Sequence, residues 1–293
     1  MRLGELALHL VSDGGFRLDG GAMFGVVPKP LWERRKPADG RNRIQLATNC
    51  LLVERGDDLV LIDSGIGDKH DEKFVDIHAI DGPVRLPESI LAAGFDLEDV
   101  THVLLTHLHF DHCGWNTRRR DGACVPTFPN ARYWLCRGEV EHARRPSLRD
   151  AASYLPENWE PLFEAGVVEL FEEQAEPVPG VRAVKAPGHN ADMCIVLLEG
   201  GGEERAAFLA DLVPTTAHLP YPWVMGYDLY PLETVDNKRR WLPGFAEERR
   251  LLIFEHDPDV PLARLVEDRP GRYAAEPVNE EAPASVGASV ERA

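Results

Sequence analysis

The chain has 293 residues, of which 44% are hydrophobic and 28% charged, so it can bury a sizeable core and is not intrinsically disordered. Its formal net charge of -17 argues against nucleic acid and anionic membranes as partners, because these bind through Lys and Arg. No window approaches the roughly 20 apolar residues of a membrane span, and the first residues lack the pattern of a secretory signal. Since the five cysteines are scattered without a CxxC pair, we expect a reduced, cytoplasmic protein.

Apolar runs with strand character occur along most of the chain. The stretch 12–43 is rich in Gly, Pro and charge, and we interpret it as an active-site lid or interaction loop. Helical spacing occurs mainly at 87–95, which Gly94 ends, and at 231–250, where we expect a break at Pro243. Strands are expected at residues 3–11, 45–54, 59–63, 101–105, 131–136, 167–171, 181–189, 192–200, 205–213 and 250–257.

The order of these elements favours a layered α/β protein in which sheets are buried under helices, because strands occur in both halves with helices between and after them. We expect residues 1–267 to form a single domain. The segment 268–293 is rich in Ala, Pro and Glu without apolar periodicity, and we interpret it as a flexible C-terminal tail.

The strongest chemical signal is the run His107-Leu108-His109-Phe110-Asp111-His112, which directly follows the strand expected at 101–105. On an extended backbone His107 and His109 point to the same side, and the two later donors follow where the chain must turn. A single histidine is usually a surface or core residue. Four donors in this spacing at a strand end are instead typical of a metal or catalytic site.

The motif H-x-H-x-D-H at a strand end resembles the signature of the metallo-β-lactamase fold hydrolases. That family has three later metal-binding positions, and this chain has matching residues in order: His189 in APGHNAD, Asp211 in FLADLV and His256 in IFEHD. Asp63 in LIDSG resembles the D-x-G loop that lies beneath the metals in the family. The resemblance implies a four-layer αββα sandwich of two mixed β-sheets flanked by helices.

The resemblance also implies a centre with two divalent metal ions. The implied ligands are His107, His109 and His189 for the first ion, Asp111, His112 and His256 for the second, and Asp211 for both. Nitrogen and oxygen donors without a thiolate favour Zn²⁺, with Mn²⁺, Fe²⁺ or Co²⁺ as alternatives. The neighbouring thiol of Cys113 is expected to point away, because the ligand set is complete without it.

Two such ions would lower the pKa of a water between them to roughly 7 or below, so that a bridging hydroxide could attack a carbon or phosphorus atom. One ion would polarise the oxygen that gains charge, and the other would steady the leaving oxygen. In this interpretation the catalytic side chains are Asp211, which joins the two ions, and Asp111, which passes a proton to the leaving group.

The sequences HLHFDHCGWNT and FEHD resemble those of the lactonase branch of this family, which includes acyl-homoserine lactonases and organophosphate hydrolases. We therefore expect the opening of a lactone or the cleavage of a related ester. The presence of both Asp211 and His256 argues against a β-lactamase proper. A glyoxalase II-like thioesterase or a phosphotriesterase stays an alternative. So does an iron-dependent redox protein, although the redox relatives place a carboxylate where this chain has His109.

One position departs from the lactonase pattern, since Pro214 stands where acyl-homoserine lactonases usually place a Tyr that helps hold the lactone carbonyl. The stretch 218–233 is dense in aromatic residues, and we expect an apolar pocket there for a small-molecule substrate. A core or homodimer contact is the alternative for these rings. The expected substrate-binding residues are Met23, Phe24, Trp115, His218, Tyr221, Trp223, Tyr227 and Tyr230.

Overall fold

The computed structural model describes residues 1–80 and 85–278, which form two seven-stranded sheets. The first sheet contains, in spatial order, β1 (Arg2–Leu3), β2 (Leu6–Asp19), β3 (Arg43–Arg55), β4 (Asp58–Ile62), β5 (His102–Leu104), β8 (Arg132–Cys136) and β9 (Val168–Phe171). The second contains β10 (Gln174–Val178), β11 (Val181–Lys185), β12 (Cys194–Leu198), β13 (Ala206–Phe208), β14 (Leu251–Ile253), β15 (Leu262–Arg269) and β16 (Arg272–Pro277). A small hairpin pairs β6 (Thr117–Arg120) with β7 (Ala123–Pro126).

Both sheets are mixed. Strands β4, β5, β8 and β9 run parallel in the first sheet, and β13 runs parallel to β14 in the second, while the other pairs are antiparallel. The helices are α1 (Gly20–Phe24), α2 (Lys29–Trp32), α3 (Glu72–His78), α4 (Leu86–Ala92), α5 (Phe110–Cys113), α6 (Arg137–Arg144), α7 (Glu160–Glu164) and α8 (Pro231–Glu247). Short 3₁₀ helices are η1 (Leu97–Asp99), η2 (Gly114–Asn116), η3 (Ala151–Ser153), η4 (Pro156–Asn158), η5 (Ala210–Leu212) and η6 (Thr216–His218).

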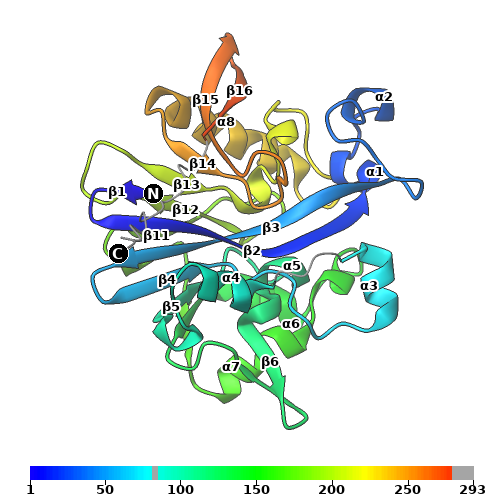
Figure 1. The fold of residues 1–293 in the computed structure, drawn as a ribbon. Helices are drawn as coiled ribbons and strands as arrows, with labels where there is room; N and C mark the ends of the chain where they lie inside the picture. Colours follow the sequence, from blue (N-terminus) through cyan, green and yellow to red (C-terminus); the bar gives the residue numbers. More distant parts are fainter. Residues whose placement is uncertain (81–84, 279–293) are drawn as a thin grey trace, which may run out of the picture.

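The two sheets pack face to face, and helices cover their outer faces (Figure 1). Strand β4 shows how its sequence achieves this, because successive side chains of a strand point to opposite faces. Val60 and Ile62 lie in the core between the sheets, whereas Leu59 and Leu61 lie in the core beneath α4, α6 and α7. On the other side, α8 packs apolar side chains such as Phe245 against the second sheet. The four-layer αββα sandwich of the sequence analysis is therefore confirmed.

The loop expected at 12–43 is shorter than predicted. Strand β2 extends to Asp19, which pairs with Arg43 at the start of β3. The register shifts between Ser12 and Gly15, and this bulge interrupts the alternation by which the sequence would reveal a strand. The segment that does connect the two strands is residues 20–42, which contains α1 and α2.

The domain boundary expected at residue 267 is wrong. Strand β15 passes through this position to Arg269 and pairs with β16, which ends at Pro277, so the first part of the expected tail is a hairpin at the sheet edge. The part from residue 279 lies outside the described residues. The break expected at Pro243 is also absent, since α8 continues to Glu247 with Leu242 and Phe245 buried on either side of the proline. Within the described ranges, no helix has both the length and the apolar character to cross a bilayer.

Candidate metal centre

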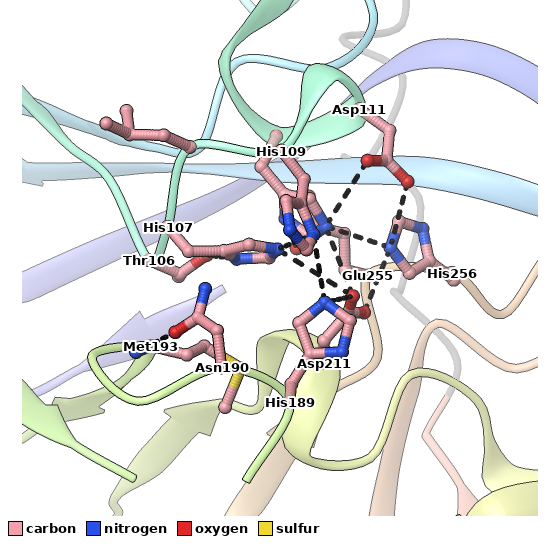
Figure 2. Close-up of polar contacts among 12 residues, drawn as sticks. Thr106, His107, His109, Asp111, His189, Asn190, Met193, Asp211, Glu255 and His256 are labelled. Atoms are coloured by element: carbon pink, nitrogen blue, oxygen red, sulfur yellow. Dashed lines mark hydrogen bonds and ion pairs between the residues drawn. The ribbon is translucent and has the colours of Figure 1, made fainter. Parts of the chain in front are cut away.

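The predicted metal-binding side chains come from loops that follow strands of both sheets. Strand β5 leads into the loop with His107 and His109, and α5 carries Asp111 and His112. From the second sheet come His189 after β11, Asp211 after β13 and His256 after β14. Figure 2 shows that the labelled members of this set point toward one another. The structure thus brings together all seven side chains that the sequence analysis singled out.

The first group consists of His107, His109, His189 and Asp211, whose nearest donor atoms all lie within 4.8 Å of one another. Nδ1 of His109 lies 3.1 Å from Nε2 of His107 and 2.9 Å from Nε2 of His189. Nε2 of His189 is also 3.1 Å from Oδ2 of Asp211. All four side chains are buried, so these donors converge away from bulk water.

The second group consists of Asp111, His112 and His256, with donor atoms again within 4.8 Å. Nε2 of His112 lies 3.2 Å from Nε2 of His256. Asp211 stands between the groups, because its Oδ1 lies 3.2 Å from Nε2 of His256 while its Oδ2 faces His189. A carboxylate in this position could contribute an oxygen to a cation on either side.

The donor atoms fit two divalent cations better than they fit one another. Ring nitrogens of different histidines lie about 3 Å apart in three contacts. A neutral imidazole carries only one N–H, so hydrogen bonds between the rings cannot account for all of these contacts. Oδ1 of Asp211 is buried and has no well-aligned hydrogen-bond partner among the described residues, although Nε2 of His256 lies 3.2 Å away. Cations would accept all these lone pairs, and the mixed nitrogen and oxygen set suits Zn²⁺ or a similar metal. The thiol of Cys113 instead donates to the carbonyl of Leu108 at 3.4 Å.

In the metal-free protein, burial and neighbouring charges shift the pKa values of these donors in both directions. Burial, reinforced by neighbouring imidazoles, lowers the pKa of His107 and of His109 well below the usual value, so both rings keep a free lone pair. Burial alone would raise the pKa of Asp211, but the surrounding imidazoles, His189 first, hold it well below the usual value. Burial opposes charge on His256, yet the carboxylate of Asp211 raises its pKa to about 9, so a cation at this imidazole would displace a proton.

Each of four imidazoles is held on the nitrogen that faces away from the cluster. Nδ1 of His107 lies 3.1 Å from Oγ1 of Thr106, and Nδ1 of His256 lies 2.8 Å from the carbonyl oxygen of Ala47. The other two contacts are His112 to Asp63 at 3.0 Å and His189 to Asp228 at 3.1 Å. An acceptor at Nδ1 places the proton there and leaves Nε2 free toward the cluster.

Asp63 lies directly beneath the cluster, at the end of β4, with a left-handed backbone at φ 54°. Its carboxylate accepts hydrogen bonds from the backbone N–H of Thr106 at 2.8 Å and from the Thr106 hydroxyl at 2.6 Å, besides facing His112. One buried carboxylate therefore fixes both the start of the histidine loop and one imidazole.

Sequence analysis missed two buried acids that contact the histidines. Asp228 precedes α8 and faces His189. Glu255 precedes His256, and its Oε2 lies 3.0 Å from Nδ1 of His112. Burial raises the pKa of Glu255 to about 8, although the His112 imidazole opposes this shift. A charged residue inside the apolar run LLIFEH was the available signal for Glu255, whereas Asp228 stands in an irregular loop.

A cavity of about 480 Å³ opens next to both groups of donors. Its walls are largely apolar, and a few polar side chains, among them Ser153 and Arg149, interrupt them. The lining residues are Leu18, Met23, Phe74, His78, His109, Phe110, Asp111, Arg149, Asp150, Ala152, Ser153, His189, Asp211, Met225, Gly226, Tyr227 and His256. Of the eight substrate-binding residues that were expected, Met23 and Tyr227 line this cavity.

Three of the expected pocket residues, Phe24, His218 and Trp223, form an aromatic cluster outside the cavity lining, in which Trp223 is partly buried and the other two are buried. The rings of Phe24 and His218 stack with centroids 4.5 Å apart, and Trp223 meets Phe24 edge-on at 5.8 Å. Nε2 of His218 lies 2.9 Å from the carbonyl oxygen of Met23, so the imidazole supports the cavity wall without reaching its lining. Their assignment to substrate binding is corrected accordingly.

The remaining three expected pocket residues also lie elsewhere. Trp115 is buried in the core of the first sheet, where its Nε1 donates to Asp13 at 2.6 Å. Tyr221 packs near Tyr273 on the β15–β16 hairpin, with ring centroids 6.4 Å apart. Tyr230 is 44% exposed just before α8. Aromatic density in the sequence did not distinguish rings that face the cavity from rings that support its walls.

The comparisons with known proteins agree with this fold and this centre. The family described as Metallo-beta-lactamase superfamily matches residues 43–239, and the chain belongs to this superfamily. The structure of a probable metal-dependent hydrolase from Staphylococcus aureus is similar, with a TM-score of 0.86 and 31% identity, over 94% of this chain and 99% of that chain.

Two lactonases are also similar to the chain. An N-acyl homoserine lactonase from Bacillus cereus is 28% identical over 168 residues, which are 54% of this chain and 60% of the lactonase. The chain therefore spans less than two thirds of that relative. The dizinc quorum-quenching lactonase AidC, in a complex with its product, shares the fold with a TM-score of 0.77 at 22% identity, over 95% of this chain and 96% of that chain.

Proposed function

We propose that the protein hydrolyses a lactone or a related carboxylic ester of a small molecule, using two divalent metal ions. The observation that carries this proposal is the pair of donor groups joined by Asp211 at the floor of an apolar cavity. The similarity to the Bacillus cereus lactonase supports a lactone as the substrate class. Zn²⁺ is the proposed metal, because imidazole and carboxylate donors without thiolate suit it.

The ions, when bound, would polarise the substrate oxygen and supply an acidified water. The residues of the chain would do the rest. Asp211 would hold both donor groups in one geometry, and Asp111 at the cavity floor would pass a proton to the leaving alcohol. The apolar walls, including Met23 and Phe110, would exclude bulk water and hold the acyl side of the ester. Tyr227, which lines the same cavity, would donate a hydrogen bond from its phenol to the substrate carbonyl.

The test combines metal analysis with a substrate panel on the purified chain. The panel contains lactones, aryl esters, phosphotriesters and thioesters, because the same centre would also accept the last two classes. We expect about two equivalents of metal and lactone or ester turnover that a chelator abolishes and added Zn²⁺ restores. Iron with oxygen-dependent chemistry, or full turnover without metal, would refute the proposal.

A matched pair of variants makes the result specific to this centre. Asp211→Asn should lose metal and at least about a hundredfold in turnover, since it removes the charge shared by both groups. His9→Asn is the control, because His9 lies on β2 beside Glu54 and away from the cluster. Retention of metal and activity by His9→Asn would exclude a general effect of losing a histidine or a charge.

A further inference from the structure

His112 differs from the other imidazoles of the centre in having two carboxylates beside its outward nitrogen. Oδ2 of Asp63 and Oε2 of Glu255 each lie 3.0 Å from its Nδ1. His107, His189 and His256 each have one such partner, a hydroxyl, a carboxylate and a carbonyl oxygen respectively. The hydrogen bond of His112 goes to Asp63, so Glu255 is a second acidic group at the same edge.

The burial of Glu255 destabilises the folded protein unless its carboxyl group is compensated. The side chain is fully buried, and neither carboxyl oxygen has a well-aligned hydrogen-bond partner among the described residues. Its ion-pair partner in the described part of the chain is His112, and no Lys or Arg reaches it there. The residues before it, Leu252 to Phe254, are apolar and buried. A buried carboxyl group without a partner destabilises a fold unless a nearby positive charge compensates it.

A cation on the inward nitrogen of His112 would supply that charge. Nε2 of His112 faces Asp111 and His256, so the imidazole separates the proposed second ion from Glu255. A carboxylate behind a metal-binding imidazole fixes the ring orientation and strengthens the donor nitrogen. Resting on the proposed function, we propose that Glu255 is a positioning residue that acts through His112 and strengthens cation binding by Asp111, His112 and His256.

If Glu255 has this role, it destabilises the metal-free protein and strengthens metal binding. The variant Glu255→Gln tests both effects. Metal-depleted Glu255→Gln should unfold at a temperature equal to or above that of the metal-depleted parent, because a buried acid has been replaced by a neutral amide. Zn²⁺ titration against a chromophoric chelator should show one of two binding constants weakened by about 10- to 100-fold. The rise in unfolding temperature on adding Zn²⁺ should shrink accordingly.

Three further variants show which site and which effect is observed. His256→Ala defines how loss of the second site changes the titration. Glu247→Gln removes a carboxylate from the exposed end of α8, and it should leave both constants unchanged. Asp63→Asn should lower both the metal affinity and the metal-free unfolding temperature, because Asp63 also holds the backbone of Thr106.

Two unchanged zinc constants in a folded Glu255→Gln protein would overturn this inference and leave the proposed function standing. A metal-free unfolding temperature well below that of the parent would also overturn it, because Glu255 would then serve the fold itself. Failure of the parent to bind two ions would instead overturn the proposed function.

Discussion

Oδ1 of Asp228 lies 3.1 Å from Nδ1 of His189, while the hydroxyl of Thr234 donates to the other carboxylate oxygen at 2.9 Å. The same segments are joined through their backbones, since Tyr230 N–H donates to the carbonyl oxygen of Gly188 at 2.8 Å. The start of α8 and the loop that carries His189 are thus tied together through one buried acid. The orientation of this imidazole depends on a helix that itself contributes no donor to the centre.

The first prediction concerns this carboxylate. Asp228→Asn should weaken metal binding at the group of His107, His109 and His189 by about 10- to 100-fold, because the amide no longer stabilises the Nδ1 proton. A chelator competition assay measures the effect. Asp236→Asn is the matched control, since this acid is exposed on the same helix. Equal affinities in Asp228→Asn and the parent would contradict the prediction.

The second prediction concerns the backbone beside His189. Gly188 has φ 145°, and a Cβ atom there would stand 2.6 Å from the backbone nitrogen of Thr234. Gly188→Ala should therefore displace the loop, lose metal, and lower the free energy of unfolding by about 2–3 kcal/mol. Gly94→Ala is the control that distinguishes backbone strain from a steric clash. Gly94 also has a positive φ, but no atom lies within 4 Å of the position that a Cβ would take.

Denaturant unfolding and metal content measure both glycine variants. Gly94→Ala should cost only about 1 kcal/mol and keep its metal. If both variants lose the same stability and both keep their metal, the close packing of α8 on the His189 loop has no role in the centre.

The first donors of this centre could be predicted from sequence because four of them lie close together at a strand end, and the resemblance to a known family supplied His189, Asp211 and His256. His107 to His112 fall within six consecutive residues, and Asp211 and His256 follow β13 and β14, which are parallel neighbours whose carboxyl ends meet at one edge. The lining of the cavity could not be predicted in this way. Residues such as Phe74 and Met225 reach it from segments without periodicity, so only tertiary packing reveals them.

The fold shows the same division. The layering of sheets beneath helices followed from apolar runs such as that of β4, which is buried on both faces, whereas the four-layer sandwich was implied by the family resemblance. The β15–β16 hairpin was missed because β16 alternates weakly and much of it is exposed, so its composition looks like that of a tail. Glu255 was missed because its contact is with His112, which is distant in sequence and follows a strand of the other sheet.

The third prediction concerns the phenol in the cavity. Burial, with the negative charges of Asp19 and Asp111 nearby, raises the pKa of Tyr227 to about 12, so its O–H stays protonated at neutral pH. Tyr227→Phe should keep its metal and lose up to about a hundredfold in turnover, because a donor to the developing oxyanion is removed. Tyr230→Phe, at an exposed position outside the cavity lining, should keep full activity. Equal turnover in the two variants would show that Tyr227 does not touch the reacting group.

The fourth prediction concerns pH. Burial lowers the pKa of His218 to about 3, against about 6.5 in an unfolded chain. Between these values the unfolded chain binds a proton that the folded protein does not, so the free energy of unfolding falls as pH falls through this window. The contribution of His218 is complete above pH 6.5 and is lost by about 1.4 kcal/mol per pH unit toward pH 3.

Urea unfolding at intervals between pH 7 and pH 5 measures this dependence in a range where few carboxylates titrate. His218→Gln should show a shallower slope than the parent, because the side chain no longer binds a proton in the unfolded state. Parallel slopes in the two proteins would mean that the His218 imidazole is protonated in the stack with Phe24.

The donors of the first group come from both sheets, His107 and His109 from one and His189 and Asp211 from the other. Neither half of the chain can therefore assemble a complete site alone. Metal bound by a truncated or recombined version of this chain would therefore indicate that its two halves pack together as in the full chain. Metal content can be measured for this purpose.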